Sequence, residues 1–354
     1  MKHIYPTYYK KFKCIANECP DSCCKDWDVV VDEESESFYN SVNTEFGEKI
    51  RSLTVTDNDG DRIFVSQNGK CPFWNKDMLC DIYINLGEEH LCETCKNFPR
   101  ITQDYTDFTE HTISLACPEG ARLILETEYD YSEFDDYKYD GDDEDLSYLL
   151  ELRYKTAQIF KNRRISFSHR LIEALEYNKD VQNSIDEISE AEGEPDLQYI
   201  FELHKKLEIM GDEWKEILES VGNNKPDVNH DIEFERLALY YIYRYYLNAI
   251  DSYDVLSTVK RIACAYLVLS RCKLADSCTR LMQLYSKEVE HSYENSEILE
   301  SEFIFAPQLS VENLILLSLI TFSPAVIPET VNSYEVSSSR ESGKLIVTVF
   351  AESS

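Results

Sequence analysis

The sequence predicts a mainly α-helical protein with a small irregular α+β portion, in which a cysteine-rich N-terminal module is packed on an α-helical C-terminal domain. Nine of the twelve cysteines lie within the first 117 residues. Beyond residue 148, apolar residues recur at three- or four-residue steps, which is the spacing of a helix face. The exception is KLIVTVF, residues 344–350, whose β-branched residues predict one late C-terminal strand.

Composition divides the chain into three segments. We expect the cysteine-rich module over 1–126, an acidic connecting loop over 127–147 and a mainly helical domain over 148–354. The connection contains EYDYSEFDDYKYDGDDEDL, which offers little that could be buried without stranding charge. In the helical domain, Ser166 is a candidate cap for a helix through Leu175. Further helices are expected over Asp231–Ile250, Thr258–Ser270 and Ser277–Tyr293.

The charge of the chain restricts its partners. Lys and Arg number 35 against 67 Asp and Glu, a net charge of -32. Such a surface repels nucleic acid and anionic membranes, and it favours a lysine-bearing protein as partner unless it serves only solubility. The longest apolar stretch, Leu314–Phe322, is too short to span a bilayer. The opening MKHIYPTYYKKF lacks an apolar signal sequence, so we expect a cytoplasmic protein with reduced thiols rather than disulfides.

The N-terminal thiols are dense enough to bind metal. They are Cys14, Cys19, Cys23, Cys24, Cys71, Cys80, Cys92, Cys95 and Cys117. Structural zinc sites commonly use two CxxC pairs, and only one such pair is present, Cys92 with Cys95. Eight or nine thiols suit an iron–sulfur cluster or two metal sites better, while zinc and thiol redox chemistry remain alternatives.

Two common cofactor templates are absent. Radical enzymes that cleave S-adenosylmethionine usually carry CxxxCxxC, but after Cys19 and Cys23 the third position is Asp26. Rossmann-type enzymes need a glycine-rich turn, and the ten glycines include no GxG. A nucleotide-like cofactor would have to be held in another way.

The sequence resembles the flagellin lysine-N-methylase family, whose cysteine-rich half belongs to a wider group of zinc- or iron-chelating cysteine-cluster proteins. Three N-terminal blocks carry the wider resemblance: YYKKFKCIANECPDSCCKDWDVVVD, CPFWNKDMLCDIYINLGEEHLCETCKNFPR and SLACPEGARL. Two blocks of the helical half narrow the resemblance from this wider group to the methylase family: LALYYIYRYYLNAI and LYSKEVEHSYEN.

The resemblance implies methyl transfer from S-adenosylmethionine to lysines of flagellin, with a [4Fe-4S] cluster in the enzyme. The cysteines that match are Cys14, Cys19, Cys23, Cys24, Cys71, Cys80, Cys95 and Cys117. Cys92 fits the pattern least well and is interpreted as an ordinary buried thiol. Eight cysteines exceed the four ligands that one cluster needs, so either a second metal site exists or several of these cysteines bind no metal.

Four polar residues of the helical half are candidates for the site. Helical spacing places Arg244 beside an apolar face, where it needs an anionic partner: a structural carboxylate, or a substrate or cofactor carboxylate. Glu288 and Asn295 share or border the inner face of the helix from Ser277, either lining a pocket or fixing the packing. His291 lies at the edge of this face, and Glu290 is expected to point away.

We assign Glu288 and His291 as candidate catalytic residues and Arg244 and Asn295 as candidate cofactor-binding residues. We also expect Arg244 and Glu288 to lie near each other. The predicted function is a protein-lysine N-methyltransferase. The alternative is a metal-stabilised scaffold without catalysis, in which the helical half recruits a basic partner.

Overall fold

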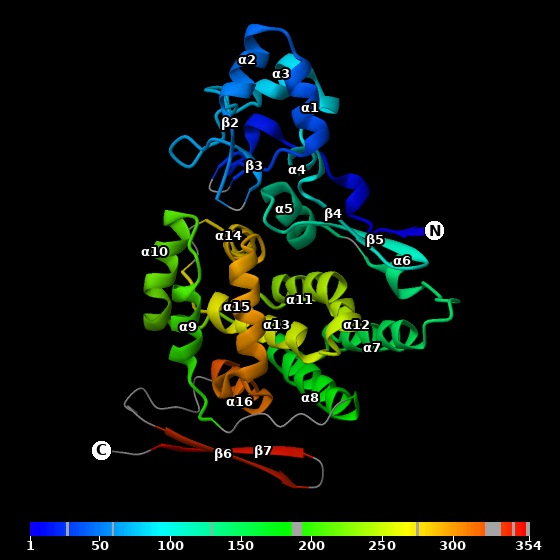
Figure 1. Ribbon diagram of the computed structural model, residues 1–354. Helices are drawn as coiled ribbons and strands as arrows, with labels where there is room; N and C mark the ends of the chain where they lie inside the picture. The colour runs from blue at the N-terminus through cyan, green and yellow to red at the C-terminus, as the bar shows by residue number, and fades with distance from the viewer. Residues whose placement is uncertain are drawn as a thin grey trace. The chain divides into compact units, whose positions relative to one another are not determined.

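The computed structural model describes residues 1–25, 28–58, 60–128, 130–185, 193–273, 276–322, 334–341 and 344–351. The chain forms two compact units (Figure 1). Unit 1 comprises Met1–Tyr137, Met210–Asp212 and Gln283–Glu288, and unit 2 comprises Lys138–Ile209, Glu213–Met282 and Val289–Ser354. Helices dominate and the sheets are small, which confirms the predicted fold class.

Unit 1 contains two small sheets and several short helices. Strand β1 (Lys2–Ile4) runs parallel to β5 (Phe108–Ile113), which pairs antiparallel with β4 (Arg100–Asp104). Strands β2 (Thr54–Thr56) and β3 (Arg62–Phe64) pair antiparallel. The helices are α1 (Glu33–Ser41), α2 (Glu45–Ser52), α3 (Asp81–Leu86), α4 (Glu93–Asn97), α5 (Pro118–Glu126) and α6 (Ser132–Asp135), with 3-10 turns η1 (Tyr9–Lys11), η2 (Ala16–Glu18) and η3 (Glu88–His90).

Local sequence fixes where these helices begin. The Asp32 side chain accepts a hydrogen bond from the Ser35 backbone N–H at 2.9 Å and caps α1. The Thr44 hydroxyl caps α2 through Gly47 N–H at 3.2 Å. Pro118 opens α5 at the position where a missing backbone donor costs nothing. Cys117, directly before it, is thereby held at a helix start.

Unit 2 is a set of helices with one hairpin. The helices are α7 (Glu144–Phe160), α8 (Phe167–Ile185), α9 (Leu197–Lys206), α10 (Asp212–Ser220), α11 (Asp231–Tyr245), α12 (Ala249–Ser252), α13 (Leu256–Leu269), α14 (Cys278–Glu290), α15 (Tyr293–Phe305) and α16 (Val311–Phe322), with 3-10 turns η4 (Val221–Asn223), η5 (Tyr246–Asn248) and η6 (Pro307–Leu309). Helix α13 is almost wholly buried and packs against α8, α11 and α16. Two of the helices also contribute to unit 1, because Asp212 and Gln283–Glu288 belong there.

Two predicted helices end earlier than the sequence pattern indicates. The helix expected to reach Ile250 stops at Tyr245 and continues as η5 and α12. Tyr246, the first residue after the break, donates a buried hydrogen bond to Asn178 of α8 at 2.6 Å. The helix expected to reach Tyr293 stops at Glu290, because the Ser292 hydroxyl accepts from the Asn295 N–H at 3.3 Å and caps α15. Tertiary contacts and caps, which carry little hydrophobic signal, decide both ends.

The remaining elements agree with the sequence in part. Helix α8 begins directly after Ser166. The acidic run contains α6 and the start of α7, whose first turn is capped by Asp143. Strand β7 (Lys344–Ala351) covers the predicted late strand and pairs antiparallel with a further strand, β6 (Tyr334–Glu341). None of the helices within the described residues is both long and apolar enough to cross a bilayer.

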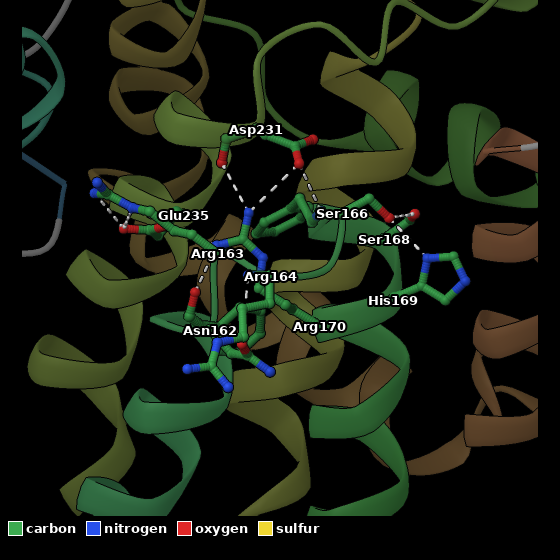
Figure 2. A network of polar contacts seen from close by, with 11 residues as sticks. Asn162, Arg163, Arg164, Ser166, Ser168, His169, Arg170, Asp231 and Glu235 are labelled. Atoms are coloured by element: carbon green, nitrogen blue, oxygen red, sulfur yellow. Dashed lines mark hydrogen bonds and ion pairs between the residues drawn. The ribbon is translucent and has the colours of Figure 1, made fainter.

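A buried ion network joins α8 to α11 in unit 2 (Figure 2). The Arg170 guanidinium, whose side chain is 1% exposed, lies 2.6 Å from a carboxylate oxygen of Glu235. Arg163 binds the same carboxylate from the other side, at 2.8 Å. Asp231 lies 3.5 Å from Arg170 and accepts a hydrogen bond from the Phe167 N–H at 2.9 Å, at the start of α8. One carboxylate thus pairs with the buried Arg170 and with the more exposed Arg163.

Buried His204 should make the stability of unit 2 depend on pH. Its Nδ1 lies 2.7 Å from the Ile200 carbonyl oxygen, and burial lowers its pKa to about 4. As the pH falls from 6.5 to 4, His204 becomes protonated in the unfolded chain but stays neutral in the folded chain. The free energy of unfolding therefore falls, by about 3 kcal/mol for this difference in pKa. Urea unfolding across this range should show the loss, and His204→Phe should flatten the slope. An unchanged slope in the variant would contradict this assignment.

Candidate functional site

The structure forms no disulfide among the twelve cysteines, all of which lie within the described residues. Cys264, Cys272 and Cys278 are buried in unit 2, where they serve as small core residues. Burial raises the pKa of each of these three thiols to about 12. The other nine cysteines belong to unit 1 and fall into two sets.

One set, the first thiol group, consists of Cys14, Cys19, Cys23 and Cys117. Three of its members lie on the loop around η2, and Cys117 precedes α5. Burial raises the pKa of Cys117 to about 12 against the lowering effect of backbone hydrogen bonds, and the charges of Cys19 and Cys14 add to the rise. A hydrogen bond with Cys24, burial, and the charges of Cys24, Cys14 and Cys117 raise the pKa of Cys23. Thiols almost a hundred residues apart in the sequence therefore act on one another.

The other set, the second thiol group, consists of Cys24, Cys71, Cys80, Cys92 and Cys95. The Cys71 N–H donates to the Cys24 carbonyl oxygen at 2.7 Å. Cys71, Cys80 and Cys95 pack against the apolar cluster of Val31, Phe64 and Phe73, in which Cys92 is itself buried. A hydrogen bond between Cys92 and Cys95 lowers the pKa of the first thiol and raises that of the second. Adjacent Cys23 and Cys24 therefore connect the two groups.

The donor chemistry of these groups fits a metal–thiolate centre, because thiolates are the ligands that iron–sulfur clusters and zinc take up most readily. The side chains are not arranged as a closed centre. In the part of the chain that the structure describes, no three Cys, His, Asp or Glu side chains are placed so that they could hold a metal ion. Metal binding would have to draw the thiols together and would be coupled to ordering of their loops.

Glu288 and Asn295 are both engaged by the backbone. The Glu288 carboxylate is buried and accepts hydrogen bonds from the N–H groups of Met210 at 2.6 Å and Gly211 at 3.0 Å. The Asn295 amide binds both backbone groups of Glu208, accepting at 2.8 Å and donating at 2.9 Å. Asn295 lies on α15, not on the predicted helix from Ser277. These contacts are those of side chains that fix loops.

His291 is the residue that follows α14, and it is partly exposed. It therefore lies at a helix end rather than on the inner face of a continuous helix. Its assigned catalytic role stays a prediction.

Arg244 finds its anionic partner in Glu290, not in Glu288. Its Nε lies 3.4 Å from Glu290 Oε2, and another of its nitrogens donates to the Tyr240 hydroxyl at 3.0 Å. Glu290 Oε2 also accepts from the hydroxyls of Tyr240 at 2.9 Å and Tyr245 at 2.7 Å. We call Tyr240, Arg244, Tyr245 and Glu290 the Glu290 cluster.

The expectation that Glu290 points away was wrong. Residues 281–289 of α14 are all buried, and the Glu290 side chain is 0% exposed, so this helix has no outer face at that level. Hydrophobic periodicity identifies one buried face and misses the second. Glu290 Oε1 is buried and has no hydrogen-bond partner among the described residues. A buried carboxylate oxygen of this kind is costly and is a candidate for contact with a ligand.

Comparison with known proteins bears on the identity of the chain. It matches no protein-family model, and no solved structure matches it. It is 31% identical over 126 residues to the lysine-N-methylases of Salmonella typhimurium and Salmonella choleraesuis, a match covering 34% of this chain and 31% of each of those proteins. The match therefore spans about a third of the length of these two relatives.

A shorter relative is covered more fully. The chain is 31% identical over 126 residues to the flagellar biosynthetic protein FliU of Salmonella muenchen, again 34% of this chain but 75% of FliU. With three relatives at 31% identity, one of them covered over 75% of its length, the chain belongs to the flagellin lysine-N-methylase family.

Proposed function

We propose that this protein is a protein-lysine N-methyltransferase that uses S-adenosylmethionine as methyl donor and flagellin as substrate. The observation that carries the proposal is the meeting of two separated sequence blocks at one buried carboxylate. LALYYIYRYYLNAI supplies Tyr240, Arg244 and Tyr245, and LYSKEVEHSYEN supplies Glu290. The family relationship and the acidic surface, with a net charge of -32, support a lysine-bearing substrate.

The reaction requires a neutral amine in line with a sulfonium methyl group. The lone pair of the lysine nitrogen attacks the methyl carbon, the carbon–sulfur bond breaks with its electrons going to sulfur, and the methylated nitrogen carries the charge. A lysine ammonium must therefore lose a proton before it reacts. An acidic group that draws in the ammonium and accepts its proton serves this step.

Glu290 is the carboxylate that we propose for this role. Its Oε2 is held by Arg244 and two tyrosine hydroxyls, which fix the orientation of the carboxylate. Its Oε1 is left for a donor outside the cluster. Glu288, the residue proposed from the sequence, has both oxygens occupied by backbone N–H groups and is better suited to a structural role.

The thiols support a resident metal centre as the second part of the proposal. The residues that would hold it are Cys14, Cys19, Cys23, Cys24, Cys71, Cys80, Cys95 and Cys117. When bound, an iron–sulfur cluster would cross-link the cysteine-bearing loops and, at an open iron, would offer a binding point for the amino acid end of S-adenosylmethionine, whereas zinc would supply the cross-link alone.

Transfer of an isotope-labelled methyl group tests the proposed activity. Anaerobically purified protein, mixed with flagellin and S-adenosylmethionine labelled in its methyl group, should place the label on flagellin lysines, as peptide mass analysis would show. Flagellin that stays unlabelled while the protein is folded and loaded with metal would overturn the proposal. Labelling of other residue types would overturn the lysine assignment.

Single cysteine variants should show which thiols bind metal and which one, Cys92, is only buried. Cys23→Ala and Cys95→Ala should lose metal and methyl transfer, whereas Cys92→Ala should keep both, since Cys92 lies outside the family pattern. Cys92 is 1% exposed, so Cys92→Ala should only lower the free energy of unfolding, by about 1 kcal/mol for a small buried side chain. Elemental analysis of iron and zinc measures the outcome. Equal metal loss in all three variants would show that the ligand set is wrong.

A scaffold that binds a basic partner without catalysis is the second candidate function, favoured by the net charge alone. It predicts salt-sensitive binding of flagellin with no transfer of label. The labelling assay therefore separates the two candidates.

A further inference from the structure

Asp21 lies in unit 1 between two cysteines of the first thiol group and is 6% exposed. Lys287 Nζ, on α14, lies 3.3 Å and 3.4 Å from its two carboxylate oxygens. The Lys287 side chain is 4% exposed, so this ion pair is largely removed from water. Lys25 approaches the same carboxylate at 2.9 Å from a more exposed position. Such a buried pair is held firmly, because breaking it would strand a charge.

Gln283 lies one turn earlier on α14, on the same face as Lys287. Its Nε2 donates to the Ala116 carbonyl oxygen at 2.6 Å and lies 3.4 Å from Asp21 Oδ2. Ala116 directly precedes Cys117, the most buried member of the first thiol group. One face of α14 therefore contacts both of the chain segments that carry this group.

The contacts continue from Asp21 toward the thiols. Asp21 Oδ1 accepts a hydrogen bond from the Ser22 N–H at 2.8 Å, and the Ser22 hydroxyl accepts one from the Cys24 N–H at 3.1 Å. The turn that carries Cys23 and Cys24 is thus tied, bond by bond, to the carboxylate that Lys287 holds. Short loops of this kind have few apolar contacts of their own and depend on such ties for order.

We propose that Gln283 and Lys287 are positioning residues, which hold the Cys19–Cys24 segment and Cys117 at a set separation so that the first thiol group is ordered for its ligand. We call this arrangement the α14 clamp. Only the role of the thiols as metal ligands rests on the proposed function. The ordering of the two segments follows from contacts within unit 1.

Amide hydrogen exchange of the full-length protein, followed by peptide mass analysis, tests the clamp. In Lys287→Met, exchange in residues 16–25 and 113–117 should accelerate about tenfold or more, while helices α1 and α2 should exchange as in the wild type. Arg280→Met is the matched control on the same helix, because Arg280 pairs with Glu213 at 2.6 Å. It should leave both thiol segments unchanged.

Lys287→Met removes one of the two cations beside the buried Asp21 carboxylate and could unfold the protein for that reason alone. A second variant therefore removes the carboxylate charge as well. Asp21→Asn combined with Lys287→Met removes both buried charges and should fold, yet it should still exchange faster at the two segments. Wild-type exchange in the folded variants would overturn the clamp, whatever the methyl-transfer activity. Faster exchange at the two segments, beside a wild type that transfers no methyl group, would uphold the clamp and defeat the proposed function.

Discussion

Glutamine in place of Glu290 should slow methyl transfer to flagellin by a factor on the order of a hundred to ten thousand while leaving the protein folded. Glutamine keeps an oxygen that can accept from the hydroxyls of Tyr240 and Tyr245, so the cluster retains its shape, but Arg244 loses its anionic partner and the melting temperature should fall. It removes the charge that draws in a lysine ammonium and the site that accepts its proton. Initial rates of label transfer at saturating flagellin, with the melting temperature measured in parallel, give the result.

Glu288→Gln is the matched control, two residues away on the same helix. Its carboxylate binds the N–H groups of Met210 and Gly211, so the change should lower stability and affect the rate only in proportion to the folded fraction. A Glu290→Gln variant that transfers methyl groups at the wild-type rate would remove Glu290 from the reaction. A folded Glu288→Gln variant with the larger loss of rate would restore the assignment made from the sequence.

Glu235→Ala should lower the free energy of unfolding of the helical unit by about 3–5 kcal/mol, because it strands Arg170 in the interior. Arg170 is 1% exposed, and the Asp231 carboxylate that remains near it lies 3.5 Å away with a more exposed side chain. Chemical denaturation monitored by helical circular dichroism measures the change. Because the chain has two units, the transition of unit 2 must be resolved from that of unit 1.

Glu151→Ala provides the control for this network. Glu151 forms an ion pair with Lys155 on the surface of α7, with both side chains at least half exposed. Exposed pairs contribute little, so this variant should unfold like the wild type. A Glu235→Ala variant as stable as the control would mean that the network of Figure 2 does not stabilise the helical unit.

Hydrophobic periodicity sufficed to place several helices of unit 2. Helices α8, α11 and α13 were expected near their observed positions for this reason. Periodicity did not predict where a helix ends when a single polar contact determines that end. The hydrogen bond from Tyr246 to Asn178 and the Ser292 cap each end an element whose residues would otherwise continue the pattern.

The candidate site was predicted less completely than the fold. Spacing identified the N-terminal thiols as a set, but it could not divide them, because Cys23 and Cys24 are adjacent and belong to different groups. Glu290 was missed since α14 is buried on every side at its end, which a single-face pattern does not represent. The pairing of Asp21 with Lys287 joins residues more than 260 positions apart, and no local signal in the sequence indicates it.

The intact mass of flagellin produced in cells together with this protein tests the central claim most directly. Flagellin made beside the wild type should be heavier than flagellin made alone by one or more methylene units, which peptide mapping should place on lysines. Flagellin made beside Glu290→Gln should remain largely unmodified. Flagellin of unchanged mass, recovered from cells that contain folded wild-type protein, would contradict the account.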